Sequence, residues 1–226
     1  MNIAILANGL FPTKAEVLAY LNTAEMVVCC DGALKNYLLW HRSQPEPPQH
    51  KLAVVGDGDS LSPALLQEAA ELGILLEHHH IPEQESNDLS KAVRHAMRMV
   101  NNSQLKKTAT VNILGATGLR EDHTLGNISL LAHYMRCYPD VEFIMRSDFN
   151  TFYPMQGHCQ FPSVKGQQVS LFSLTPEVPV SVSGLRYPIE NRCLHSWWEG
   201  TLNEALGDTF EVTGGTMIVV IELCER

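Results

Sequence analysis

The first two thirds of the chain alternate short apolar runs with amphipathic stretches. Runs long enough for a buried strand occupy residues 3–7, 26–30, 52–55, 74–77, 110–114 and 141–145. Between them, apolar residues recur at helical spacing, as in the stretches 89–100 and 125–135. This alternation predicts an α/β fold, with a mainly parallel sheet and helices that cover its faces.

A helix over residues 64–72 has clear boundary signals. Ser62 and Pro63 occupy the positions preferred at a helix start, and Gly73 stands where helices commonly stop. The stretch 43–50 holds three prolines, so we predict a loop there.

The spacing of apolar residues changes to a period of two after about residue 148. Alternation is visible at 169–171, 178–182 and 217–223, with Gly, Pro and Asn turns between these segments. A period of two is typical of strands that bury one face. We therefore predict an α/β domain over residues 1–148 and an all-β sandwich domain over residues 149–226.

Charge and composition narrow the classes of partner. The 226 residues carry a formal net charge of −9. This excess of carboxylates disfavours binding to nucleic acids or to anionic membranes, so we expect neither as a partner. A small anion such as ATP would need a divalent cation to offset the repulsion.

The cysteines and the apolar runs bear on the compartment. The chain has 6 cysteines without a CxxC pair, so we expect free thiols and a reducing environment. The first apolar run has no basic segment before it, and no run approaches the ~20 residues that a membrane helix needs. We expect a soluble, cytoplasmic protein.

The segment 56–60 reads Gly-Asp-Gly-Asp-Ser and directly follows an apolar run. Ligands of parallel sheets bind at the carboxyl ends of the strands, where Asp57 and Asp59 would lie. Paired carboxylates among small residues suit a hard cation such as Mg²⁺. The alternative is an ordinary Asp/Gly turn.

Two further polar clusters follow predicted strands. Asp88 opens a predicted helix, where a carboxylate either binds a ligand or only stabilises the first turn against the helix dipole. The segment 115–123 is rich in small residues and contains Arg120, Asp122 and His123. Its backbone amides and Arg120 suit a phosphate, whereas Asp122 and His123 offer a base or a hydrogen-bond acceptor. The alternative is that Asp122 is only an N-cap and His123 only a helix residue. The chain has no GxxxxGK[ST] motif, so any phosphate binding must use other groups.

Two aromatic clusters admit more than one interpretation. His78, His79 and His80 are consecutive, so in a strand they alternate between faces, and the sequence shows no spaced Cys or His partner. They could suggest a zinc site, but without such partners we interpret them as structural residues and not as metal ligands. Trp197 and Trp198 could form the aromatic wall of a ligand site or could simply be partly buried.

The order of the motifs resembles thiamine pyrophosphokinases over essentially the whole chain. The matching segments are Asp31-Gly32, 56–60, 82–84 leading to Asn87-Asp88, 115–127, 183–187 and 201–204. Asn87 stands where that family has Thr, Leu119 where it has the second Gly of GATGGR, and Lys35 where it usually has Asn. The family's aromatic residue after Asn203 is missing, and we expect Trp197 or Trp198 to replace it.

The resemblance implies a Mg²⁺-dependent homodimer that transfers the pyrophosphate of ATP to the hydroxyl of thiamine, giving thiamine diphosphate and AMP. It implies thiamine binding between the α/β domain of one subunit and the β domain of its partner. Asp57, Asp59 and Asp88 would hold the metal, Arg120 would clamp phosphate, and Asp122 would hold or activate the hydroxyl. Further binding residues would be Asp31, Gly32, Gln84, Gly115, Thr117, His123, Asn127, Trp198 and Asn203. The alternatives are a metal-dependent phosphohydrolase, because Asp57-x-Asp59 is similar to an aspartyl-nucleophile motif, and a non-catalytic thiamine- or nucleotide-binding protein.

Overall fold

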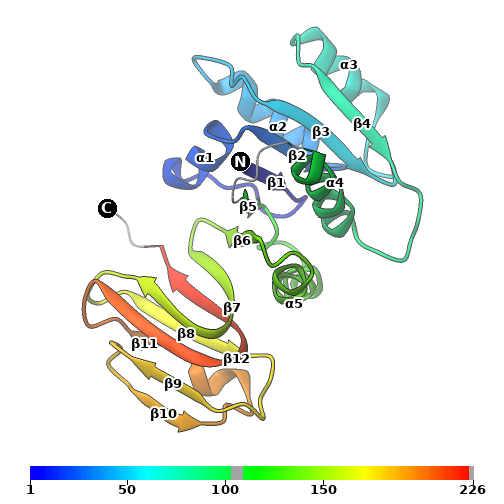
Figure 1. Ribbon diagram of the computed structural model, residues 1–226. Coiled ribbons are helices and arrows are strands. Elements are labelled where there is room, and N and C mark those ends of the chain that lie inside the picture. Colours follow the sequence, from blue (N-terminus) through cyan, green and yellow to red (C-terminus); the bar gives the residue numbers. More distant parts are fainter. Residues whose placement is uncertain (103–108, 224–226) are drawn as a thin grey trace. The chain divides into compact units, whose positions relative to one another are not determined.

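The computed structural model describes residues 1–102 and 109–223 (Figure 1). The chain divides into two compact units. The first comprises residues 1–127, 140–142 and 146–148, and the second comprises 128–139, 143–145 and the chain from Phe149 onward. Helix α5 (Glu121–Cys137) and strand β6 (Val141–Arg146) therefore contribute residues to both.

A parallel sheet forms the centre of the first unit. Its strands are β1 (Asn2–Leu6), β2 (Met26–Cys30), β3 (Lys51–Gly56), β4 (Leu76–His80) and β5 (Ala109–Leu114), in the order β5-β1-β2-β3-β4. Each neighbouring pair is parallel. The apolar residues of β1 and β2 are almost completely buried, as expected for strands that are covered on both faces. This confirms the parallel α/β fold that the sequence predicts.

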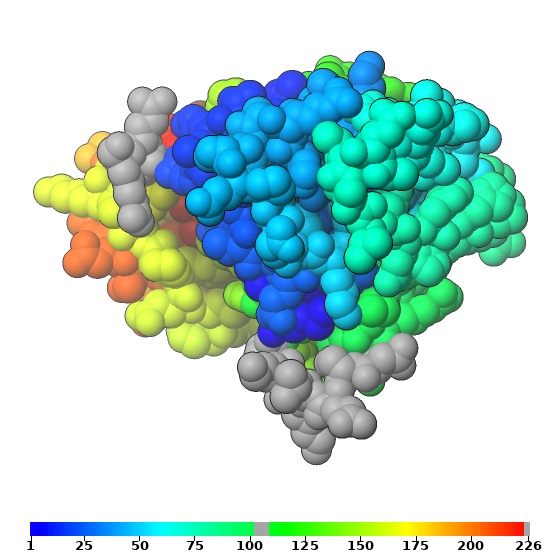
Figure 2. Space-filling view, turned by 90° about the horizontal axis from the view of Figure 1, so that it is seen from above, coloured from blue at the N-terminus to red at the C-terminus, as the bar shows by residue number. Residues whose placement is uncertain are grey.

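Helices cover both faces of this sheet. Helices α1 (Ala15–Asn22), α2 (Ala33–Ser43) and α3 (Pro63–Glu71) each connect a strand to its next neighbour, and α2 packs against α3. Helix α4 (Asp88–Asn102) returns from the edge strand β4 and packs on β1, β2 and β3 from the other side (Figure 1). The right-handed rule for parallel connections accounts for this division. In Figure 2 the segments of this unit, coloured blue to green, lie against one another without a break.

The predicted helix 64–72 is confirmed as α3, but the predicted strand 74–77 is wrong in position. Gly73 adopts a φ of 72° after α3, and the N–H of Ile74 still donates to the carbonyl of Ala69 at 3.0 Å. Residue 74 therefore belongs to the capping turn that follows the helix and not to a strand. Strand β4 starts later and continues through the histidines, with His78 opposite Val54 and His79 opposite Val55.

The second unit is antiparallel and rich in β-structure, as predicted. Its strands are β7 (Asn150–Pro162), β8 (Gln168–Ser173), β9 (Val180–Ser183), β10 (Ile189–Arg192), β11 (Asn203–Glu204) and β12 (Thr209–Glu222). The long β12 pairs with β7 along its length. A register shift between Gly214 and Met217 separates its first part, which pairs with β9, from its second part, which pairs with β8.

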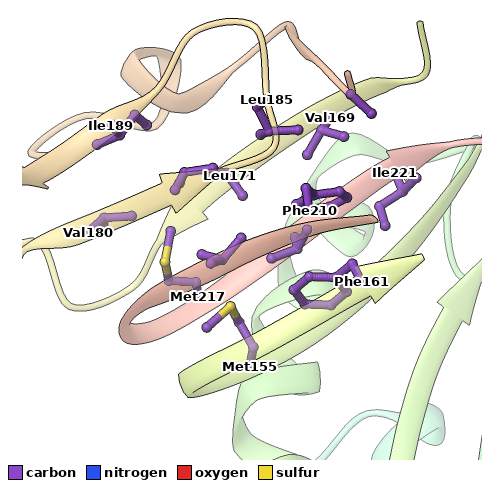
Figure 3. Packing of buried hydrophobic residues seen from close by; sticks show 14 of the residues in the cluster. Met155, Phe161, Val169, Leu171, Val180, Leu185, Ile189, Phe210, Met217 and Ile221 are labelled. Carbon is purple, nitrogen blue, oxygen red and sulfur yellow. The ribbon is translucent and has the colours of Figure 1, made fainter. Parts of the chain in front are cut away.

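One apolar cluster holds the second unit together (Figure 3). Phe161 of β7 and Phe210 of β12 stack with their ring centroids 5.3 Å apart. Leu171 of β8, Val180 of β9 and Val219 of β12 are fully buried beside them. Burial of such side chains stabilises a fold by roughly 1.5–3 kcal/mol each, so this cluster is enough to give the unit a core of its own.

The structure bears on two expectations, namely that the cysteines are free and that no helix spans a membrane. Cys29, Cys30, Cys137, Cys159 and Cys193 are free thiols, as predicted, and Cys224 lies outside the described residues. Among the described helices, none has both the length and the apolar character that crossing a membrane requires.

Candidate active site at the carboxyl ends of the parallel strands

The loops that follow the parallel strands enclose a cavity of about 440 Å³ in the first unit. A cavity at this edge is expected because the carboxyl ends of parallel strands meet there. The predicted site residues that line it are Asp57, Gln84, Asp88, Gly115, Thr117, Arg120, His123 and Asn127. These residues come from segments that are far apart along the chain.

Three carboxylates converge at one side of the cavity. Oxygen atoms of Asp31, Asp57 and Asp88 all lie within 4.8 Å of one another. Asp31 follows β2, Asp57 follows β3 and Asp88 opens α4, so the sheet order places them side by side. Asp59 is not part of this group: its side chain is exposed, and its backbone N–H donates to Asp57 Oδ1 at 3.2 Å.

Asp31 is held in an unusual backbone conformation. Its φ of 31° is rare for a residue with a side chain, and only 3% of the residue is exposed. Its Oδ2 accepts the N–H of Ser60 at 2.9 Å, but the buried Oδ1 has no hydrogen-bond partner among the described residues. A Cβ at Gly56 would lie 2.7 Å from that Oδ1, so only glycine leaves room for it. A buried carboxylate oxygen without a partner is costly unless a cation binds it.

Asp57 is fixed as an ionised acceptor. The backbone N–H of Asp59 donates to its Oδ1, and the amide of Gln84 donates to its Oδ2 at 3.0 Å. These two hydrogen bonds, with the charge of Lys91, outweigh desolvation and lower the pKa of Asp57. Asp57 therefore presents a negative charge to the cavity at neutral pH.

Lys91 is a site residue that the sequence analysis missed. It lies in α4, lines the cavity and is only 1% exposed. Its Nζ is 3.2 Å from Asp88 Oδ1 and 3.6 Å from Asp57 Oδ2. Burial alone would lower the pKa of Lys91, but the hydrogen bond to Asp88 and the surrounding carboxylates outweigh it and raise that pKa. The sequence signal was the i, i+3 pair Asp88–Lys91, which is also typical of a solvated helix surface.

The cluster has the charge that a divalent cation would neutralise. Burial raises the pKa of Asp88, and the charges of Asp57 and Asp31 raise it further, while Lys91 opposes the shift. With all groups ionised, the three carboxylates and one ammonium carry a net charge of −3 + 1 = −2. Clustered carboxylate oxygens are the donors that Mg²⁺ prefers, so the residues present fit this ion.

The opposite side of the cavity is formed by the loop after β5. Gly115 has a φ of 64°, and a Cβ there would lie 2.7 Å from the carbonyl of Ala7, so the loop can approach the end of β1 only with glycine. Asn127 is buried and donates to the carbonyl of Ala116 at 2.9 Å, which braces the loop from α5. Asn87 in turn donates to Asn127 Oδ1 at 3.3 Å. Asn127 therefore positions the loop as well as lining the cavity.

Arg120 and Asp122 form an ion pair where this loop leads into α5. The guanidinium Nη2 and Nε lie 2.6 and 3.1 Å from the two oxygens of Asp122, and both side chains are mostly exposed. Asp122 also accepts the backbone N–H of His123 at 2.9 Å. The hydrogen bonds from Arg120 and His123 lower the pKa of Asp122. In this arrangement Asp122 is a weak base, and the donors of Arg120 are directed to a carboxylate.

The remaining predicted residues lie outside the cavity lining. Gly32 is the N-cap of α2, and a Cβ at its position would lie 2.7 Å from Asn8 Nδ2, so the Asn8 side chain would have to move. In the second unit, Asn203 donates to the carbonyl of Tyr187 at 2.7 Å and accepts the N–H groups of Tyr187 and Glu204, so its amide is used within the fold.

The two tryptophans differ in their surroundings. Both belong to the 3₁₀ helix η1 (Trp197–Gly200). Trp197 donates its Nε1–H to the carbonyl of Ser173 at 3.2 Å and packs edge-on against Phe172. Trp198 is 73% exposed. Trp197 is thus anchored in the second unit, while the ring of Trp198 is available to a ligand or partner.

Comparisons with known proteins agree with this arrangement. Two family profiles match in order: "Thiamin pyrophosphokinase, catalytic domain" over residues 17–143 and "Thiamin pyrophosphokinase, substrate-binding domain" over residues 150–220. Thiamine pyrophosphokinase 1 of Oryza sativa subsp. japonica is 24% identical over 203 residues, which cover 83% of this chain and 73% of that protein.

Solved structures show the same fold. Thiamin pyrophosphokinase from Candida albicans superposes with a TM-score of 0.78 at 20% identity, covering 99% of this chain and 90% of that one. The enzyme from Bacillus subtilis gives 0.75 at 17% identity and covers 99% of both chains. Because the catalytic profile alone spans more than half of the 226 residues, the chain belongs to the thiamin pyrophosphokinase family of ATP-dependent enzymes.

Proposed function

We propose that the cavity of the first unit binds Mg²⁺ and ATP and directs the pyrophosphoryl group to the hydroxyl of thiamine. The observation that carries this proposal is the convergence of Asp31, Asp57 and Asp88, with the buried Lys91, opposite the glycine-containing loop after β5. Catalysis of phosphoryl transfer depends mainly on positioning and charge neutralisation, which these groups supply.

The carboxylates of Asp31, Asp57 and Asp88 would hold Mg²⁺. When bound, the ion would offset the charge of the triphosphate and help to orient it. The Oδ1 of Asp31, which is buried and has no hydrogen-bond partner among the described residues, supports the proposal because it is an unused acceptor on a residue of the cluster. The sequence predicts Asp59 as a ligand as well, and in the structure its backbone amide holds Asp57 in place.

In the proposed reaction the hydroxyl oxygen of thiamine attacks the β-phosphorus of ATP. The bond between this phosphorus and the oxygen that bridges it to the α-phosphorus breaks, and AMP leaves. The hydroxyl proton passes to Asp122. Arg120 would exchange Asp122 for a phosphate, which offers the guanidinium a similar pair of acceptors. Loss of Arg120 as a neighbour removes the main cause of the lowered pKa of Asp122, so the carboxylate becomes a better proton acceptor when ATP is bound.

We propose different roles for the two domains. Residues 1–148 would bind Mg²⁺ and ATP, whereas residues 149–226 would contribute to thiamine binding and to a homodimer. The exposed indole of Trp198 supports this because an aromatic face suits a cationic ring such as the thiazolium of thiamine. The free thiols support a reducing compartment, and we place the reaction in the cytoplasm.

Identification of the nucleotide product tests the proposed reaction. Protein, Mg²⁺, ATP and thiamine are incubated, and the products are separated by chromatography. We expect AMP and thiamine diphosphate in equal amounts and no AMP without thiamine. Phosphate release that does not need thiamine would instead indicate the metal-dependent phosphohydrolase, and ligand binding without turnover would indicate a non-catalytic binding protein.

A further inference from the structure

A second cluster of ligating side chains lies between β4 and α4. One oxygen of Glu77, one ring nitrogen of His79 and one of His95 all lie within 4.8 Å of one another. His79 Nε2 is 3.4 Å from Glu77 Oε2, and the rings of His79 and His95 have centroids 4.2 Å apart. None of these three residues lines the cavity described above.

The fold brings these residues together across a strand and a helix. Glu77 and His79 are two residues apart in β4, so both side chains project from the same face of the strand, while His78 and His80 project from the other. His95 lies in α4, two turns after Asp88, and meets His79 from the helix. The sequence alone showed only the consecutive histidines, because the third member, His95, lies 16 residues after His79 and in another element.

His95 has the burial and the unused ring nitrogen that suit a metal ligand. It is 5% exposed, and its Nε2 is buried without a hydrogen-bond partner among the described residues. An unpaired buried polar atom costs free energy, roughly 1–3 kcal/mol. Burial lowers the pKa of His95, electrostatic repulsion from the neighbouring His79 and Arg98 lowers it further, and Glu77 only partly opposes this. The ring therefore stays neutral at physiological pH, which is the form that binds metals.

We propose that Glu77, His79 and His95 form a binding site for Zn²⁺, separate from the acidic cluster. Two imidazoles and one carboxylate are a common ligand set for zinc, and nitrogen donors disfavour Mg²⁺. The Zn–N bond is about 2.0–2.1 Å, so the ligand atoms must close in from their present separation. Glu77 and His79 are partly exposed, which lets their side chains turn and lets the ion enter from solvent.

A zinc ion at this site would cross-link β4 to α4. Helix α4 also carries Asp88 and Lys91 on its first turn. Zinc binding would therefore stabilise the helix that supplies the acidic cluster, but it would not take part in the chemistry at that cluster.

Zinc titration of the full-length protein tests the site. The acidic cluster is first saturated with excess Mg²⁺, and Zn²⁺ affinity is measured by competition with a chromophoric chelator. We expect one zinc per chain, and a loss of affinity of at least about tenfold in His79→Gln and in His95→Gln. His78→Gln, on the other face of β4, and His133→Gln, beside Cys137, should bind zinc as the unchanged protein does. Thermal melts should show a zinc-dependent rise in Tm that both ligand variants lose.

Co²⁺ provides an independent readout, because a site with two imidazoles gives visible absorption bands that should disappear in His79→Gln. His79 is half-exposed, so we expect His79→Gln to fold. If His95→Gln fails to fold, His79→Gln alone tests whether the cluster binds the metal. The proposal is overturned if the protein takes up no zinc, if both ligand variants bind it unchanged, or if raising Mg²⁺ displaces it, because the ion would then occupy the acidic cluster.

Discussion

The ammonium group of Lys91 lies 3.2 Å from the carboxylate of Asp88, one turn before it in α4, and the lysine is almost completely buried. A buried lysine needs paired charges, and here Asp57 is its second neighbour at 3.6 Å. Lys91 thus offsets part of the repulsion between the carboxylates of Asp57 and Asp88.

Lys91→Met should therefore destabilise the protein when no divalent cation is present. Leaving buried carboxylates without their counter-charge costs on the order of 3 kcal/mol, and Mg²⁺ should restore much of this loss. Thermal or urea unfolding with EDTA and with Mg²⁺ measures both effects. Lys51→Met, which removes an exposed lysine from β3, should change neither. Equal stability of Lys91→Met and the unchanged protein in EDTA would contradict this role for Lys91.

We expect Asp→Asn variants inside the acidic cluster to lose much more activity than the variant at Asp59, which lies outside it. Asp31→Asn, Asp57→Asn and Asp88→Asn each remove a proposed metal ligand while keeping the side-chain size. We expect kcat to fall by about 100-fold or more in each, which corresponds to roughly 2.7 kcal/mol, with partial rescue at high Mg²⁺. Asp59→Asn should lose less than about tenfold, because its carboxylate lies outside the cluster and its amide is retained. Thiamine diphosphate formation across a Mg²⁺ titration, alongside thermal melts, distinguishes these cases. A loss in Asp59→Asn as large as that in Asp31→Asn would restore Asp59 as a ligand.

The pair Arg120–Asp122 predicts a shift in the pH dependence of the reaction. Arg120 lowers the pKa of Asp122, so Arg120→Gln should raise that pKa toward its ordinary value. If Asp122 must be ionised to accept the hydroxyl proton, the acidic limb of the kcat/KM profile, which reports the free enzyme, moves to higher pH in the variant. KM for ATP should rise as well, because a bidentate phosphate contact is lost. An acidic limb that stays in place in Arg120→Gln, but disappears in Asp122→Asn, would show that Arg120 does not set this pKa.

Stability should fall in mild acid because of His50. Its Nε2 contacts the hydroxyl of Tyr37 at 2.6 Å, and burial, with the charge of His41, lowers its pKa to about 4. Between that value and the ordinary pKa of about 6.5, the unfolded chain binds the proton and the folded chain does not, so the free energy of unfolding decreases as pH falls. The decrease should be on the order of 1–3 kcal/mol and should be smaller in His50→Gln. Urea unfolding at a series of pH values measures it, and an unchanged slope in the variant would assign the effect to other groups.

Subunit mixing tests the proposed shared thiamine site. Asp57→Asn damages the first domain and Trp198→Ala the second, so each homodimer should be poorly active. Heterodimers would contain one site with both domains intact, and mixing should recover part of the activity. Mixtures no more active than the average of the two variants, in a protein shown to be dimeric, would place each thiamine site within one chain.

Much of the site could be predicted from sequence because its segments follow parallel strands. Asp57 and Gly115 come directly after apolar runs, whereas Asp88 opens a helix eight residues after the end of β4. The carboxyl ends of parallel strands lie at the same edge of the sheet. The sequence alone could therefore predict that Asp57, Asp88 and Gly115 lie near one another. What could not be predicted were contacts set by how α4 packs on the sheet. Asp88–Lys91 has the spacing of a solvated pair, and only the packing of α4 on β3 buries the lysine. The contact between His95 and His79 also depends on how α4 packs on the sheet, so it could not be predicted either.

The fit between Gly56 and Asp31 limits which substitutions the chain can accumulate. A β-carbon at position 56 would collide with the Asp31 carboxylate, and a residue without a carboxylate at position 31 would leave the cluster with one ligand fewer. Neither position can change alone without loss, although they are separated by a helix and a strand. In a related protein that has lost the activity, both positions would be free to change. A residue other than glycine at position 56 would therefore indicate an inactive relative.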